Sequence, residues 1–62
     1  MTNLEHWNRD GWSFVCFWSK WGTYIGRAYR EIGGESIILR VEDPKRERVY
    51  TQLDALVLRL PN

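Results

Sequence analysis

The chain has 62 residues, a formal net charge of +1, and an aromatic set of four Trp, three Tyr and two Phe. A chain this short forms one domain at most and has no room for separate cofactor and substrate domains. One cysteine and one histidine exclude an intrachain disulfide and a four-ligand Cys/His zinc site. We therefore expect a single domain over residues 1–62, without cofactor or metal, stabilised by an aromatic core or by self-association.

The charge balance argues against two common classes of partner. Seven Arg and two Lys face eight acidic residues, so there is no large positive excess for coating nucleic acid or an anionic membrane surface. The longest apolar run, residues 14–18, is far shorter than the ~20 residues that span a bilayer. No basic and apolar leader opens the chain. The lone thiol suits a reducing compartment, so we expect a cytoplasmic protein with no membrane association.

Residues 1–11 read as an N-terminal segment that leads into a core over residues 12–60. The spacing of Leu4 and Trp7 allows a single helical turn over residues 3–9. Asp10-Gly11 is a strong turn signal.

Two strands are predicted next. Residues 12–20 alternate with an apolar inner face made of Trp12, Phe14, Cys16 and Trp18. Residues 24–32 form the second strand, in which the small Gly26 leaves room for a large ring such as that of Trp18. A helix is the competing interpretation of residues 24–32, because Tyr24, Ala28 and Ile32 are spaced by four.

Gly33-Gly34 predicts a hairpin turn between two β-rich runs. Residues 36–42 form the next strand, with Ile37, Leu39 and Val41 on its inner face. A turn at residues 43–45, containing Pro44, then leads to a short strand over residues 47–50.

The last ten residues of the core fit two structures. Thr51 and Asp54 suggest a helix start at 51–55, and the alternation of Leu56, Leu58 and Leu60 suggests a strand at 56–60. With that strand, the fold is all-β, a small barrel or curled sheet of four to five short antiparallel strands with a helical turn before the last. That order resembles a small SH3-like barrel, in pattern only. With a full helix over 51–60, the fold is instead α+β, an antiparallel sheet with a C-terminal helix.

Motifs for catalysis are missing. There is no phosphate-binding loop or dinucleotide-binding fingerprint. Cys16 and His6 form the only pair that resembles a nucleophile and a base, but Cys16 lies in the most apolar run, where a thiol is inert. We expect a protein that is not an enzyme.

Aromatic and arginine residues carry the best functional signal. Tryptophan, tyrosine and arginine dominate the energetic centres of protein interfaces, and several of them do not fit the expected core face. The structural alternative is that the N-terminal segment folds over the sheet and covers these rings. The charged run over residues 42–48 is either a solvated tip or a further contact with an acidic partner. The candidate partner-binding residues are Trp7, Phe17, Trp21, Arg27, Tyr29, Arg30, Arg40, Lys45, Arg46 and Arg48.

We therefore expect a small protein-binding module, of the kind that acts as a stand-alone inhibitor or accessory protein. The alternative is a nucleic-acid-binding small barrel that stacks bases on its Trp and Tyr rings and contacts phosphates with arginine. Apolar side chains on the expected outer faces, Phe17 and Ile38, also predict a homodimer.

Overall fold

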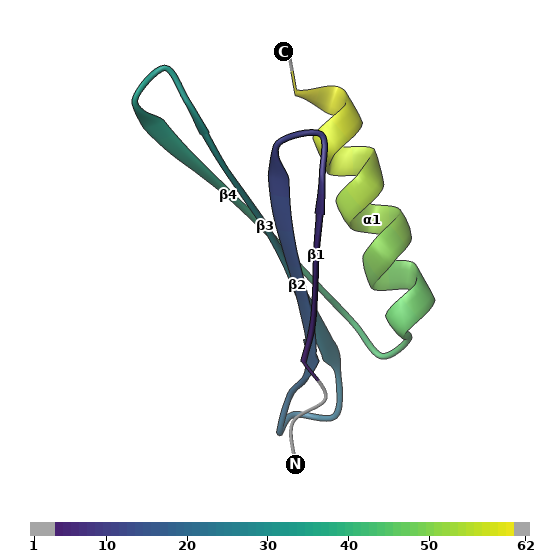
Figure 1. Ribbon diagram of the computed structural model, residues 1–62. Coiled ribbons are helices and arrows are strands. Elements are labelled where there is room, and N and C mark those ends of the chain that lie inside the picture. Colours follow the sequence, from purple (N-terminus) through teal and green to yellow (C-terminus); the bar gives the residue numbers. More distant parts are fainter. Residues whose placement is uncertain (1–3, 61–62) are drawn as a thin grey trace.

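Four strands and one helix follow one another in the computed structural model, which describes residues 4–60 (Figure 1). The elements are β1 (Glu5–Arg9), β2 (Trp12–Trp18), β3 (Tyr24–Ile32), β4 (Glu35–Asp43) and α1 (Arg46–Arg59). Neighbouring strands are antiparallel, and their order in the sheet is β1-β2-β3-β4. The sheet is open, not closed into an SH3-like barrel, and the architecture matches the α+β alternative.

Tight turns set the register of the sheet at two places. Asp10 and Gly11 have φ angles of 52° and 84°, so both turn residues lie in the left-handed region that a type I′ hairpin requires. This turn makes residues 5–9 the strand β1 and pairs Trp7 with Phe14. The predicted helical turn over 3–9 is therefore wrong for the described residues 4–9. The hairpin predicted at Gly33-Gly34 is confirmed.

The helix begins earlier than the sequence suggested. Asp43, at the end of β4, accepts a hydrogen bond from the backbone N–H of Lys45 at 2.9 Å, and α1 starts at the next residue. The predicted strand over residues 47–50 and the predicted strand over 56–60 are both wrong, because α1 runs through them. Thr51 does not cap a helix, since its hydroxyl donates to the carbonyl oxygen of Glu47 one turn back at 3.0 Å.

The core lies between α1 and the sheet. Val49 and Leu53 are fully buried and belong to one cluster with Phe14 and Cys16. Burial of each large aliphatic side chain contributes roughly 1.5–3 kcal/mol. Because the inner face of β2 is apolar at Trp12, Phe14 and Cys16, the helix has a continuous surface to cover, as predicted.

Gly26 is small because the helix lies on it, and not because it makes room for Trp18. A Cβ at this position would come within 2.8 Å of the Leu53 side chain and would collide with Val49. Trp18, expected in the core, is 46 % exposed and packs edge-on against Tyr24 with 4.8 Å between ring centroids. It lies at the end of β2, away from the buried cluster formed by Val49 and Leu53.

Polar and aromatic contacts tie α1 to β1 at the edge of the sheet. The Glu5 carboxylate accepts hydrogen bonds from the Tyr50 hydroxyl and, at 3.4 Å, from Arg46. The Trp7 ring stacks on Phe14 with 5.2 Å between centroids and meets Tyr50 edge-on. The helix thus covers one side of the sheet from β4 to β1. We call the other side, turned away from α1, the open face.

Candidate functional site

The register places nine side chains on the open face in a three-by-three grid across β2, β3 and β4. The middle row is Val15, Arg27 and Arg40. The two flanking rows are Phe17, Ile25 and Glu42 on one side, and Ser13, Tyr29 and Ile38 on the other.

Apolar groups on this grid range from buried to fully accessible. Ile38 is 65 % exposed and Tyr29 is 41 % exposed, although both lie near the middle of long strands. Ile25 is buried and Phe17 is half-buried, and the Arg27 guanidinium lies over the Phe17 ring at 5.8 Å from its centroid. Water therefore reaches the apolar groups of Tyr29 and Ile38 at one end of the grid, whereas Arg27 lies over part of the other end.

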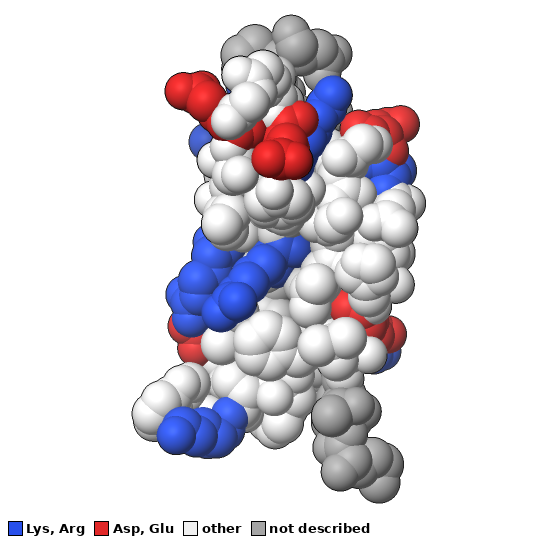
Figure 2. All heavy atoms as spheres, turned by 60° about the vertical axis from the view of Figure 1, so that its left-hand side comes forward, with Lys and Arg blue, Asp and Glu red and all other residues white. Residues whose placement is uncertain are grey.

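The centre of the grid is basic. Arg27 and Arg40 are direct cross-strand partners, and side chains in such pairs lie about 4.5–5.5 Å apart at Cβ. Figure 2 shows a group of basic side chains at mid-height of the face that it displays, from the left margin to the centre, with acidic side chains nearer the margins. Like charges placed opposite each other destabilise a sheet.

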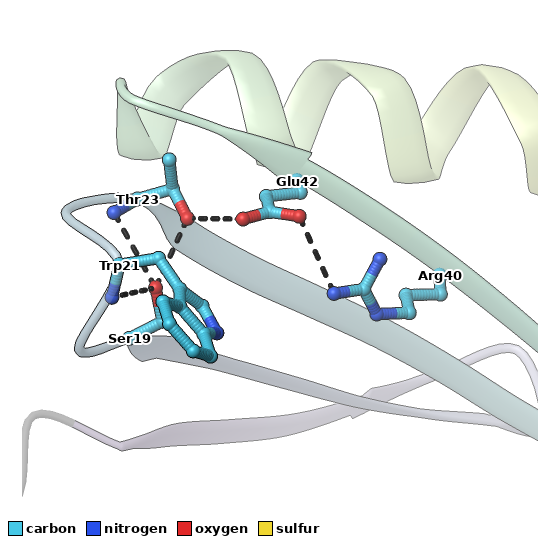
Figure 3. A network of polar contacts seen from close by, with 5 residues as sticks. All are labelled: Ser19, Trp21, Thr23, Arg40 and Glu42. Atoms are coloured by element: carbon cyan, nitrogen blue, oxygen red, sulfur yellow. Dashed lines mark hydrogen bonds and ion pairs between the residues drawn. The ribbon is translucent and has the colours of Figure 1, made fainter.

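A hydrogen-bond network links the grid to the loop between β2 and β3 (Figure 3). Arg40 donates to one oxygen of Glu42 at 3.3 Å, and the Thr23 hydroxyl donates to the other. Ser19 Oγ lies 3.0 Å from the Thr23 hydroxyl and accepts the backbone N–H of Trp21 at 3.2 Å. The hydrogen bond from Thr23, together with the charge and hydrogen bond of Arg40, holds the pKa of Glu42 below its usual value despite some desolvation. Glu42 therefore stays charged, and its hydrogen bond holds the Arg40 side chain in place.

Trp21 is the most exposed aromatic side chain among the described residues. Its accessible fraction is 72 %, and the Lys20 ammonium lies 4.9 Å from the centroid of its ring. The backbone of its loop is held by Ser19, which is itself buried, and by Gly22 at a φ of 84°. A rigid loop thus presents a large apolar ring at one end of the open face (Figure 3).

Five of the ten residues predicted to bind a partner come together here: Phe17, Trp21, Arg27, Tyr29 and Arg40. Two others lie on the helix side of the sheet, where Trp7 packs against Phe14 and Arg30 lies over the Trp12 ring at 5.9 Å. Because β1 extends the sheet edge, it does not fold over the open face to cover the rings there.

The other three predicted residues, Lys45, Arg46 and Arg48, lie at the start of α1. Arg46 pairs with Glu5, and none of the three is part of the grid. The predicted charged tip at residues 42–48 is the end of β4, a short turn and the first turn of the helix.

Sequence reasoning missed Ser19, Thr23 and Glu42, which hold the loop and Arg40 in place. Their roles depend on contacts between residues up to 19 positions apart, for which the sequence has no local signal. It assigned Ile38 to a dimer contact and left it out of the partner-binding set.

Cys16 and His6 do not form a catalytic pair. The thiol is buried under α1, and burial, followed by the nearby Glu5 carboxylate, raises its pKa. His6 pairs with Val15 and lies on the opposite side of the sheet from Cys16. Within residues 4–60, no group of three potential ligands from His, Cys, Asp and Glu is placed to hold a metal.

Comparisons with protein-family models, with curated proteins and with solved structures find no match to this chain. Over the described part of the chain, α1 is the one helix, and it is too short and too polar to cross a membrane.

Proposed function

We propose that this chain is a non-enzymatic protein-binding module, an inhibitor or accessory protein, that contacts its partner with the open face and Trp21. The observation that carries the proposal is the co-location of exposed apolar and arginine side chains on a face that α1 leaves uncovered. Exposed aromatic, aliphatic and arginine side chains in one patch are typical of interface centres. The hydrogen bonds around Ser19 and Glu42 keep this patch ordered before any partner arrives, which lowers the entropy lost on binding.

The size of the open face fits a whole-face contact. The four strands hold 5, 7, 9 and 9 residues. At about 3.4 Å along the strand and about 4.8 Å between strands for each residue, the sheet face spans on the order of 500 Å². One partner in a standard interface contributes about 800 Å². The face and the Trp21 loop together approach that value, so a specific contact needs both. We infer that the module acts by occupying a surface of its partner.

Charge and side-chain type favour a protein over nucleic acid. Glu42 lies in the row next to Arg27 and Arg40, and Glu31 follows Tyr29 on the same strand, so phosphates along a strand would meet carboxylates. Ile38, the most exposed apolar residue of the grid, offers no ring for base stacking.

The test compares open-face variants with a matched variant on α1. Trp21→Ala and Ile38→Ser remove exposed apolar groups of the site, and Leu58→Ser removes one that is 84 % exposed on the helix. Each variant, checked by circular dichroism, is used to capture partners from the native host with and without nuclease. We expect the open-face variants to lose a nuclease-resistant partner that wild type and Leu58→Ser retain.

Two results would contradict the proposal. Loss of the partner on Leu58→Ser alone would place the site on α1. Loss on nuclease treatment, together with a steep decline of binding with salt, would show that the ligand is nucleic acid.

A further inference from the structure

We propose that Arg27 and Arg40 form a carboxylate-binding centre, and that the partner supplies an extended segment with Asp or Glu two positions from an apolar residue. This inference rests on the proposed function and names the chemistry that the open face recognises. It is drawn from charge complementarity within the grid.

The centre of the grid carries more positive than negative charge. Three ion pairs are present within residues 4–60, and Arg27 belongs to none of them. Arg40 has one partner, Glu42, whose other oxygen is already bonded to Thr23. The two guanidinium groups thus have a single acidic partner between them, and it contacts Arg40 alone. A guanidinium offers five N–H donors in a planar fork that suits a carboxylate.

Both arginine side chains are held in place by neighbouring groups. Arg27 lies over the Phe17 ring at 5.8 Å, and Arg40 is held by Glu42 at 3.3 Å. Since both are restrained before binding, less rotamer entropy is lost when a carboxylate arrives. An incoming carboxylate also relieves the repulsion between the two cross-strand charges.

The two rows that flank the arginines differ in charge, and this sets the side on which the ligand extends. On one side of the arginine row lies Glu42, which repels a second carboxylate. On the other side lie Tyr29 and Ile38, both exposed. Successive rows of a sheet face are two residues, or about 6.8 Å, apart, which is also the distance between positions i and i+2 of an extended segment. A carboxylate on the arginine row therefore places the apolar side chain two positions away, at i+2 or i−2 according to the direction of the segment, over Tyr29 and Ile38.

The experiment is a selection of random 12-residue peptides displayed on phage against the wild-type protein. The enriched peptides are sequenced, and the most enriched one is synthesised and titrated by isothermal calorimetry. The test variant is Arg27→Gln/Arg40→Gln. Its matched control is Arg48→Gln/Arg59→Gln, which makes the same change of net charge on α1. Ile38→Ser reports binding to the open face without a change of charge, and melting temperatures confirm that all variants are folded.

We expect enriched peptides to carry Asp or Glu with an apolar residue two positions away, at i+2 or i−2. The arginine double variant should lose about tenfold or more in affinity, the scale of one charge-assisted hydrogen bond, and the control should stay within about twofold. Replacement of the acid in the peptide by its amide should weaken binding to wild type but not to the double variant.

The remaining outcomes overturn the inference in distinguishable ways. Peptides without acid that are lost on Ile38→Ser would refute the carboxylate centre and leave the proposed function standing. A selection that enriches no peptide would refute the carboxylate centre. Enriched peptides whose affinity is unchanged by every open-face variant would refute the carboxylate centre and would also count against the proposed site. If the wild-type protein binds a mixed-sequence 12-nucleotide single strand and the arginine double variant does not, the arginine pair binds phosphates instead of carboxylates.

Discussion

Gly26→Ala probes the packing of α1 on the sheet, because the added methyl group would enter the space now filled by the helix. A Cβ at this position would collide with Val49 and lie 2.8 Å from Leu53 and 3.4 Å from Val41. All three side chains are buried, so none can turn into solvent. Such overpacking lowers the free energy of unfolding by about 1–3 kcal/mol. The loss of glycine flexibility in the unfolded chain raises it by about 0.4–1 kcal/mol. We therefore expect a net loss of about 1–2 kcal/mol.

Urea unfolding followed by tryptophan fluorescence measures this loss. With a slope near 1 kcal/mol per molar urea, typical of small domains, the midpoint should fall by about 1–2 M. Val49→Ala alone should cost about 2 kcal/mol, because it removes two buried methyl groups and leaves a cavity. The double variant should be more stable than the sum of the single effects by about 1 kcal/mol, since the new methyl group fills part of that cavity. A neutral or stabilising Gly26→Ala, or strictly additive effects, would refute the contact.

Three further predictions concern Cys16, Tyr50 and the oligomeric state. A thiol reagent should modify native protein slowly and urea-unfolded protein quickly, because Cys16 is 1 % exposed and its pKa is raised; rapid native labelling would contradict this. Burial, reinforced by the hydrogen bond to Glu5, raises the pKa of Tyr50 to about 12. The folded state therefore favours the protonated phenol, so its contribution is complete below about pH 10 and is lost as the pH rises toward 12. In Tyr50→Phe the free energy of unfolding should change less with pH across that range. The same pH dependence as in wild type would disprove the role of this tyrosine. The homodimer expected from Phe17 and Ile38 stays a prediction, which light scattering at micromolar concentration would reject by finding a monomer.

The alternation of apolar and polar residues predicted the central strands of the fold well. The strand over residues 24–32 and the inner face of Ile37, Leu39 and Val41 are confirmed, because strict period-two patterns and a Gly-Gly turn leave few alternatives. The strand β1 was missed because its sequence, Glu5 to Arg9, is mostly polar and has weak strand preference. The helix was misread at its end because Leu58, which fits a strand pattern, is exposed on α1 and does not help to cover the sheet.

Part of the candidate site could also be predicted from the sequence. The two-residue turn at Asp10-Gly11 already implied that Trp7 lies opposite Phe14 on the core side, and that Trp7 is not free for a partner. The pairing of Arg27 with Arg40 could not be predicted, because it depends on the register between two strands. The network from Ser19 to Glu42 depends on the same register.

The central claim is that the open face, and not the helix, meets the partner. Cross-saturation transfer from the captured partner to methyl groups of the labelled protein tests it most directly. Ile38 on the open face and Leu58 on α1 serve as paired reporters, because both are exposed. We expect the Ile38 methyl signals to lose intensity when the partner is irradiated and those of Leu58 to keep it. Attenuation at Leu58 with Ile38 unchanged would contradict the account.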